Sequence, residues 1–349
     1  MINKKIIAIV FGSYSFEHEI SIVSSIAMKK VLDNKLVYIF IDKDREFYNI
    51  PSDIIKSNLF SSGEYKKYDK LQLTNEGFIK KTFFGTKKIE FDVVLNLVHG
   101  GDGEDGVLAG LFKFYNIPFI GPRLEASVIS CNKYFTKSYL SACGVNFLDY
   151  KYFNKSDEIK IDKYPVIIKP VRLGSSIGIS IVRNEQELDY ALDIAFEFDT
   201  EIIIEPFIEG IKEYNLAGTK INNEFIFSIV EEPHKEQFLD FEKKYLDFNR
   251  TSQILRAEIS TDLEDRLKED FKKVYSNFFE GSLIRCDFFV LEDKVYINEI
   301  NPIPGSMANY LFSDFQFVIE SLADSLPSCK EIQINYDYVN KIQSAKGKA

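Results

Sequence analysis

The stretch "FDVVLNLVHGGDGEDGVLAGLFKFYNIPFIG", residues 91–121, decides the fold of the N-terminal part of the chain. Residues 91–100 are an almost continuous apolar run that ends in glycine, which is typical of a strand buried on both faces. Residues 104–116 have the apolar spacing of a helix, and residues 117–121 predict a short second strand. Strands joined through a helix in this way lie parallel. We therefore predict a βαβ unit.

The same alternation continues toward the N-terminus. Residues 4–11 and 35–41 are β-branched and aromatic runs that predict two more buried strands. Residues 45–90 are polar and weakly patterned, which is typical of short strands and loops. Between the two buried strands, residues 17–32 predict a helix with an apolar face made of Ile20, Val23, Ile26, Ala27 and Val31. This pattern predicts an α/β unit with an open parallel sheet.

The rest of the chain predicts two α+β units. The first combines helices at 125–144 and about 184–198 with strands within 147–153, 164–170, 178–182 and 201–208. In the second, we expect hairpin turns at Asn222-Asn223 and Glu292-Asp293, a capping box of Thr261 and Glu264, and a helix face of Leu263, Leu267, Phe271, Val274 and Phe278. The expected domains are residues 1–122, 123–213 and 214–335, with a lid loop at 233–256, a last helix at 313–325 and a flexible tail at 336–349.

Composition excludes several classes of protein. The 349 residues are 45% hydrophobic and 28% charged, which provides enough apolar content for more than one core. A formal net charge of −10 argues against an electrostatic grip on nucleic acid or on an anionic membrane. No apolar run approaches the roughly 20 residues that span a bilayer. The four scattered cysteines predict reduced thiols. We expect a cytoplasmic protein that binds neither nucleic acid nor membrane.

A predicted hairpin at residues 283–302 ends in polar side chains. Strand alternation gives two sets that share a face: Arg285, Asp287 and Phe289 on the first strand, and Ile297, Glu299 and Asn301 on the second. Together, Asp287, Glu299 and Asn301 offer only oxygen ligands, which suit Mg²⁺. A solvated hairpin edge would carry the same residues, so the spacing alone leaves both interpretations open.

A glycine- and serine-rich loop is the second candidate feature. In "IIKPVRLGSSIG", residues 167–178, Lys169 ends a strand and Gly174, Ser175 and Ser176 follow. Glycines let backbone N–H groups approach an anion, and the lysine supplies positive charge, so the loop favours phosphate. An ordinary turn has the same composition. The sequence contains neither a P-loop nor a G-x-G-x-x-G dinucleotide fingerprint.

Several motifs then occur in a familiar order. "FGSYSFEHEISIVSS", "LVHGGDGEDGVLAGLF", "GPRLEASVISCNKYFTKSYL", "IIKPVRLGSSIG", "IEPFIEG", "RCDFFV" and "NEINPIPG" resemble the ATP-grasp ligases, and within them the D-alanine–D-alanine ligases, over residues 5–325. The resemblance implies a three-domain ATP-grasp architecture. It also implies ATP-dependent joining of two D-alanines through an acyl phosphate, with release of ADP and phosphate, for peptidoglycan precursor synthesis. The implied metal is Mg²⁺ or Mn²⁺, and the implied assembly is a homodimer.

The resemblance also assigns nucleotide and metal contacts. Lys133 and Lys169 match lysines that contact the phosphates, and Glu205 matches the residue that meets the adenine. Glu213 stands one place later than the ribose-binding acid of the family. The full set of matching nucleotide contacts is Lys133, Lys169, Ser176, Glu205, Phe207, Ile208, Glu213, Lys244 and Phe289. The matching metal ligands are Asp287, Glu299 and Asn301.

The substrate and catalytic positions that the resemblance assigns are Glu17, His99, Ser175, Tyr245, Arg285, Gly305 and Tyr310, of which Tyr310 departs from the family pattern. By resemblance, Arg285 and the Gly305 N–H stabilise a tetrahedral oxyanion, and Glu17 holds the ammonium of the first D-alanine. At a helix N-terminus, Glu17 is equally typical of a helix-dipole partner. Tyr310 stands where the family commonly has serine, so a ligase with a different acceptor is an alternative. A nucleotide-binding regulator without catalysis is another, although the presence of Arg285 argues against it.

Overall fold

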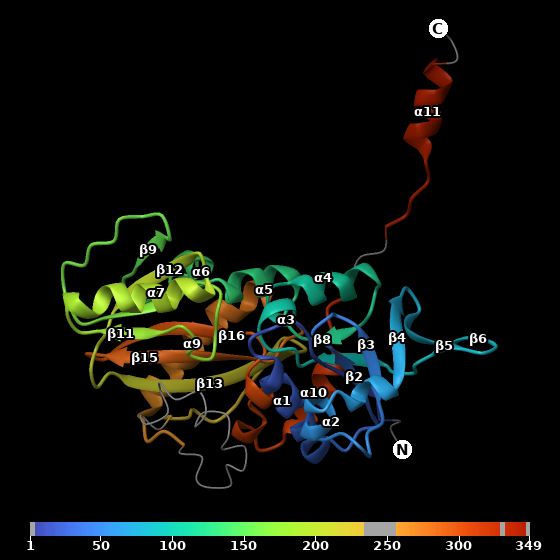
Figure 1. The fold of residues 1–349 in the computed structure, drawn as a ribbon, viewed down its shortest axis with the longest axis horizontal. Coiled ribbons are helices and arrows are strands. Elements are labelled where there is room, and N and C mark those ends of the chain that lie inside the picture. The colour runs from blue at the N-terminus through green and yellow to red at the C-terminus, as the bar shows by residue number, and fades with distance from the viewer. Residues whose placement is uncertain (1–3, 234–255, 329–331, 347–349) are drawn as a thin grey trace.

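The structure is a computed structural model that describes residues 4–233, 256–328 and 332–346. The described strands form one eight-stranded sheet and two four-stranded sheets (Figure 1). No helix among these residues is both long and apolar enough to cross a membrane.

The N-terminal sheet has the strand order β6-β5-β4-β3-β2-β1-β7-β8. Its strands are β1 (Ile7–Gly12), β2 (Leu36–Ile41), β3 (Phe47–Ile50), β4 (Asp69–Thr74), β5 (Gly77–Thr82), β6 (Gly85–Lys88), β7 (Val93–Asn96) and β8 (Phe119–Ile120). The predicted parallel sheet is present as β2-β1-β7-β8. Strands β3 to β6 extend it in antiparallel fashion, so that the sheet as a whole is mixed.

Helices cover both faces of the N-terminal sheet. Along β1, Ile9 and Phe11 point into a core shared with α1 (His18–Val31), α2 (Ser57–Ser61) and α10 (Phe315–Asp324). Ala8 and Val10 point to the opposite face, where α4 (Val107–Phe114) packs. This alternation is what a strand buried on both faces requires. The shorter helices of this unit are η1 (Glu64–Lys67), whose Tyr65 joins the core with α1 and α2, and α3 (Gly101–Glu104).

The second sheet has the order β11-β10-β12-β9 and is antiparallel. It consists of β9 (Lys151–Asn154), β10 (Val166–Pro170), β11 (Ser180–Val182) and β12 (Glu201–Pro206), with α5 (Leu124–Cys131), α6 (Lys133–Ala142), η2 (Glu185–Glu187) and α7 (Leu188–Phe198). Its core packs α7 against β10 and β12.

The third sheet has the order β14-β13-β15-β16. It consists of β13 (Lys212–Ile221), β14 (Glu224–Phe227), β15 (Ile284–Leu291) and β16 (Lys294–Asn301), followed by η4 (Gly305–Leu311), with α9 (Thr261–Phe278) against one face. Figure 1 shows the second and third sheets as stacked layers at one end of the molecule and the N-terminal sheet at the other. The expected hairpin turns are confirmed, since Asn222, Asn223, Glu292 and Asp293 all have positive φ.

Three expectations about helices need correction. Residues 125–144 form two helices, because Asn132 leaves the helical conformation and caps α6 by accepting a hydrogen bond from the Phe135 N–H. The cap of α9 is Ser260, whose side chain accepts from Leu263, rather than Thr261 with Glu264. The tail includes a helix, α11 (Asp337–Lys346), where the sequence predicted a frayed end.

Candidate active site

The predicted site residues lie around one cavity of about 630 Å³. Its lining takes residues from all three sheets or their connections. Among the predicted site residues, those that line it are Glu17, His99, Lys133, Lys169, Ser175, Ser176, Glu205, Phe207, Ile208, Glu213, Arg285, Asp287, Phe289, Glu299, Asn301, Gly305 and Tyr310. The other two, Lys244 and Tyr245, lie outside the described residues, as does most of the predicted lid loop at 233–256. A cavity of this size is in the range that binds small molecules.

A β-bulge shapes the β15–β16 hairpin toward its open end, away from the turn at Glu292-Asp293. Asp287 pairs with Glu299, but Phe288 pairs with Ile297, so Asn298 is an extra residue on β16. The bulge reverses the side-chain alternation along that strand. Ile297 is therefore fully buried in the core behind the sheet, and the prediction that it shares a face with Glu299 is wrong. Asn298 points into the cavity region, where it accepts a hydrogen bond from Lys169 at 3.2 Å.

The open end of the hairpin holds a compact set of charged and amide groups. The Arg285 guanidinium donates to both carboxylate oxygens of Asp287, at 2.6 and 2.8 Å. The Asn301 amide donates to Asp287 at 3.1 Å. Burial raises the pKa of Asp287, Arg285 opposes this rise, and the facing Glu299 adds to it. Burial lowers the pKa of Arg285, but the Asp287 charge more than compensates and raises it well above its ordinary value.

The side-chain oxygens at this end of the hairpin fit Mg²⁺ as ligands. Two carboxylates, Asp287 and Glu299, face each other across the ladder beside the Asn301 amide. Magnesium commonly takes one or two carboxylates and completes its shell with water and phosphate oxygens. Within residues 4–233, 256–328 and 332–346, no three His, Cys, Asp or Glu side chains gather as a metal cluster.

A buried ion cluster lies deeper in the cavity. Glu205 pairs with Lys137 at 2.5 Å and with Lys169 at 2.6 Å, and both the carboxylate and the Lys137 ammonium are almost fully buried. Burial alone would raise the pKa of Glu205, but Lys169 and Lys137 lower it to about 2. Burial lowers the pKa of Lys137 and of Lys133. The Lys133 ammonium also donates to the Leu173 carbonyl at 2.5 Å.

The predicted purine contacts gather at one end of the cavity. Phe207 and Ile208 follow β12, and Phe289 lies on β15 at 7% exposure. Glu213 on β13 pairs with Phe289 across the sheet and also lines the cavity. An apolar wall with carbonyl and amide groups from the chain after β12 suits a flat heterocycle.

Glu17 lies where the first helix meets the glycine-rich loop. Its carboxylate accepts a hydrogen bond from the Ser175 hydroxyl, and Ser175 and Ser176 both have positive φ. A Cβ at Gly100, whose φ is +62°, would approach a Glu17 oxygen to 2.5 Å. Glu17 occupies the N-cap position of α1 but makes no side-chain cap hydrogen bond there. The carboxylate instead lines the cavity.

Helix α1 turns its predicted apolar face partly to the core and partly to the cavity, since Ile20 is buried and Ile26, Ala27 and Val31 pack partly against the core. Its fully packed side includes Ser21, Ser24, Ser25 and Met28, whereas four of the five predicted face residues are only half-buried. Those four line the cavity: Val23, Ile26, Ala27 and Val31. The opposing wall is the chain that follows β16, with Ile303, Gly305 and Tyr310. A Cβ built on Gly305 would meet nothing within 4 Å, so its backbone faces open space.

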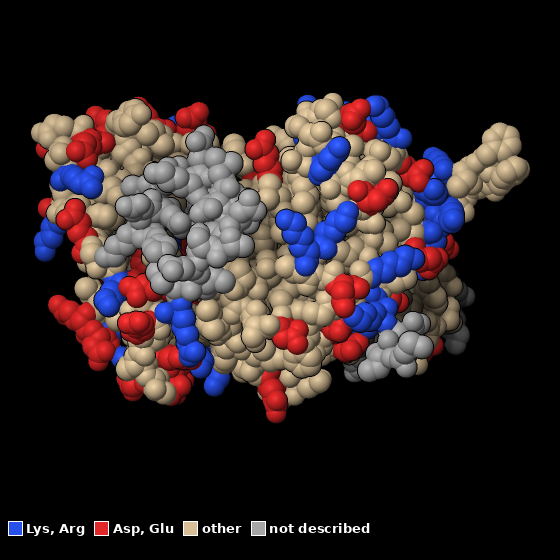
Figure 2. Space-filling model, turned by 90° about the horizontal axis from the view of Figure 1, so that it is seen from below, with Lys and Arg blue, Asp and Glu red and all other residues tan. Residues whose placement is uncertain are grey.

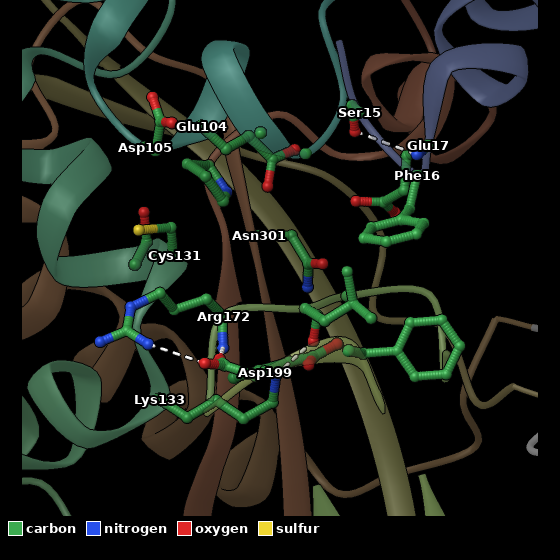
Figure 3. Close-up of a pocket in the computed structure, with 18 of the residues that line it drawn as sticks. Ser15, Phe16, Glu17, Glu104, Asp105, Cys131, Lys133, Arg172, Asp199 and Asn301 are labelled. Atoms are coloured by element: carbon green, nitrogen blue, oxygen red, sulfur yellow. Dashed lines mark hydrogen bonds and ion pairs between the residues drawn. The ribbon is translucent and has the colours of Figure 1, made fainter. Parts of the chain in front are cut away.

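A second cavity of about 610 Å³ adjoins the first on the other side of Glu17. Figure 3 shows its walls, with Glu104, Asp105 and Cys131 opposite Phe16, and with Arg172 bonded to Asp199 at 2.8 Å. Glu17, Lys133 and Asn301 line both cavities.

Figure 2 shows acidic and basic side chains interspersed over the described part of one outer face.

Sequence reasoning missed three residues that the structure brings to the site. Lys137 pairs with Glu205, Asn298 bonds Lys169, and Ser24 bonds both His99 and the backbone of Ser306. Lys137 follows Lys133 by one helical turn, and this spacing could have identified it. The bulge at Asn298 and the burial of Ser24 leave no such pattern.

Comparisons with known proteins agree with this geometry. Residues 6–122 match the family description "D-ala D-ala ligase N-terminus", and residues 140–317 match "D-ala D-ala ligase C-terminus". The D-alanine--D-alanine ligase of Sulfurovum sp. (strain NBC37-1) is 59% identical over 345 residues, which cover 98% of this chain and 99% of the relative.

Solved structures resemble the chain in the same way. The D-alanine-D-alanine ligase from Helicobacter pylori has a TM-score of 0.84 and 49% identity, and covers 93% of this chain and 100% of its own. The VanG D-Ala:D-Ser ligase from Enterococcus faecalis has a TM-score of 0.71 and 25% identity, over 92% of this chain and 98% of its own. The expected ATP-grasp fold is confirmed by these matches. This chain belongs to the D-alanine–D-alanine ligase family.

Proposed function

We propose that the protein is an ATP-dependent ligase that joins two D-alanines into D-alanyl-D-alanine for peptidoglycan precursor synthesis. The observation that carries this proposal is the one cavity that is lined by Lys133 and Lys169, by Phe207 and Phe289, and by Arg285 and Gly305. One molecule of ATP and two small amino acids need such adjoining compartments. High identity to named ligases over nearly the whole chain supports the same function.

In the proposed reaction, the γ-phosphate of ATP passes to the carboxylate of the first D-alanine. Glu17 holds the ammonium group of that substrate, and His99 lies beside it. Lys133 and Lys169 neutralise the triphosphate, whose arrival draws Lys169 from Glu205. Ser176 covers the phosphates from the loop after β10, Lys244 lies near the γ-phosphate, and Ser175 with Tyr245 closes the loop over Glu17.

The amine of the second D-alanine then attacks the acyl phosphate. The resulting tetrahedral centre carries a negative oxygen, which Arg285 and the Gly305 N–H stabilise, and phosphate leaves as the peptide bond forms. Preorganised donors of this kind can each contribute on the order of 3 kcal/mol. Tyr310 borders the space left for the acceptor.

Nucleotide and metal contacts complete the proposal. The purine lies between Phe289 and the chain at Phe207 and Ile208, with Glu205 near its amine, and Glu213 takes the ribose. Asp287, Glu299 and Asn301 would hold Mg²⁺ or Mn²⁺. When bound, this ion neutralises the charge that develops on the phosphate oxygens.

The test is phosphate release with ATP, Mg²⁺ and D-alanine. We expect release with D-alanine, and a loss of at least about a hundredfold in Glu299→Gln, because the variant removes a carboxylate ligand. Glu292→Gln is the matched control, since Glu292 is exposed at the turn of the same hairpin. Turnover in Glu299→Gln equal to that of the control would contradict the metal assignment.

Acceptor identity needs its own arm of the assay. D-serine, D-lactate and L-alanine are supplied in parallel with D-alanine, because Tyr310 departs from the serine of the family pattern. Release of phosphate only with D-serine or D-lactate as acceptor would contradict D-alanyl-D-alanine synthesis and indicate a ligase with a different acceptor. Nucleotide binding without turnover would indicate a regulator.

We place this reaction in the cytoplasm, where ATP is available, and expect a homodimer, which light scattering can check. The proposed division is residues 1–122, 123–213 and 214–335. Each of these segments contributes its own sheet. Helix α10 packs on the N-terminal sheet, although it lies within the last segment.

A further inference from the structure

The hydroxyl of Ser24, in the middle of α1, joins two parts of the site that are distant in sequence. Ser24 is fully buried. Its Oγ lies 2.9 Å from Nε2 of His99 and accepts a 3.1 Å hydrogen bond from the Ser306 N–H. We propose that Ser24 is a positioning residue of the ligase, which holds the His99 ring and the Gly305–Ser306 backbone in a fixed relation around the two amino-acid substrates. The inference rests on the proposed function.

The backbone held by Ser24 is strained. Ser306, Met307 and Ala308 have φ values of 49°, 55° and 48°, a left-handed run of three residues other than glycine. Such conformations persist only where the surroundings hold them. Within the loop, Met307 N–H bonds the Pro304 carbonyl at 2.7 Å and the Asn309 amide bonds the Ser306 carbonyl at 2.7 Å. Ser24 supplies an anchor from a separate helix.

The anchor acts next to the proposed oxyanion donor. The Ser306 N–H belongs to the peptide unit directly after Gly305, so fixing it restrains the direction of the Gly305 backbone. Since Ser24 accepts from Ser306, its own proton is available to Nε2 of His99. In that arrangement the ring proton of His99 is on Nδ1, which lies 3.8 Å from Glu104. One hydroxyl thereby orients both a ring and a loop.

A matched control lies next in the chain. Ser25 is also fully buried on α1, but its hydroxyl bonds the Ile22 carbonyl of the same helix at 2.7 Å. Ser25→Ala therefore removes a buried hydroxyl without touching His99 or the Gly305 loop. Ser24→Thr keeps the hydroxyl, and Ser24→Cys keeps the volume with a weaker acceptor.

The experiment measures kcat and the KM values for D-alanine and ATP in the full-length protein and these variants. In Ser24→Ala we expect kcat to fall by about tenfold or more and the D-alanine KM to rise, on the scale that misplaced catalytic groups cost. The ATP KM should stay within about twofold, because the lysine cluster is untouched. Ser24→Thr should recover most of the loss, and Ser25→Ala should resemble the wild type.

Three results would overturn the inference: equal effects of Ser24→Ala and Ser25→Ala, a loss confined to the ATP KM, or no recovery in Ser24→Thr. Thermal melts identify any variant that does not fold. If Ser24→Ala does not fold, Ser24→Cys decides. We expect its kcat to be lower than that of the wild type and of Ser24→Thr but above zero. A wild-type kcat in Ser24→Cys would overturn the inference. A wild-type protein that releases no phosphate with D-alanine would instead refute the proposed function.

Discussion

At Glu205, two ammonium groups share one buried carboxylate. Lys137 and Lys169 each contact a different oxygen, which leaves one net positive charge in the cluster. Burial of unbalanced charge is costly. A triphosphate arriving at this end of the cavity would supply the missing negative charge. Binding of the nucleotide would thus neutralise a positive charge that is unbalanced in the free protein.

The pKa of Glu205 makes a prediction about acid stability. Its pKa falls from 4.5 in the unfolded chain to about 2 when folded, which corresponds to about 3 kcal/mol. Because the folded pKa is the lower one, this stabilisation is fully present above pH 4.5 and is lost as pH falls toward 2. Glu205→Gln should be less stable than wild type near neutral pH, and the difference in unfolding free energy should shrink across that window.

Urea unfolding at a series of pH values measures this difference. Glu209→Gln is the control, since Glu209 is exposed four residues later. A Glu205→Gln difference that stays constant down to pH 2 would show that the lysines do not set this pKa.

At the scale of elements, some features of the site follow from local pattern and others do not. The hairpin turns at Asn222-Asn223 and Glu292-Asp293 are local, because asparagine and acidic residues tolerate positive φ. The bulge at Asn298 is set by pairing with β15, so alternation alone misplaces Ile297. The apolar spacing of α1 could be recognised in the sequence, but whether these residues face the core or the cavity could not. Apolar residues line substrate cavities as well as cores, and only tertiary packing separates the two.

The loop after β16 makes a prediction of its own. The Cβ added in Gly305→Ala meets no protein atom within 4 Å, so the melting temperature should be unchanged. The methyl group would project into the space proposed for the substrates. We expect kcat/KM for D-alanine to fall by about a hundredfold, the cost of displacing a reacting group by roughly 1 Å. Steady-state phosphate release tests this, and full activity in the variant would move the substrates elsewhere.

At the scale of the whole molecule, a helix from the last unit, α10, joins the core of the first sheet. Helix α10 shares a core with β1 and α1 and approaches β8 and β13 most closely, and Lys5 bonds the Ala323 carbonyl at 2.7 Å. Sequence alone indicated the helix, but long-range packing of this kind has no local signature. Family motifs supplied the order of the units, and the covering of the first sheet by the last helix came from the structure.

This contact predicts where stability resides. Ile319 on α10 is fully buried, and Ile319→Ala should cost about 2–5 kcal/mol of unfolding free energy. Phe317→Ala on the same helix is the control, because Phe317 is 55% exposed. Hydrogen exchange should show faster exchange in β1 together with α10 in Ile319→Ala. Exchange that rises in α10 alone would mean that the helix does not support the sheet.

The return of α10 has a consequence for biosynthesis. While the ribosome is still making the C-terminal part of the chain, the face of β1 that carries Ile9 and Phe11 lacks its final cover. The core that contains Ile9 and Phe11 is therefore completed only after α10 has been synthesised. During that interval the apolar side chains on this face are covered only by elements that precede α10, such as α1 and α2.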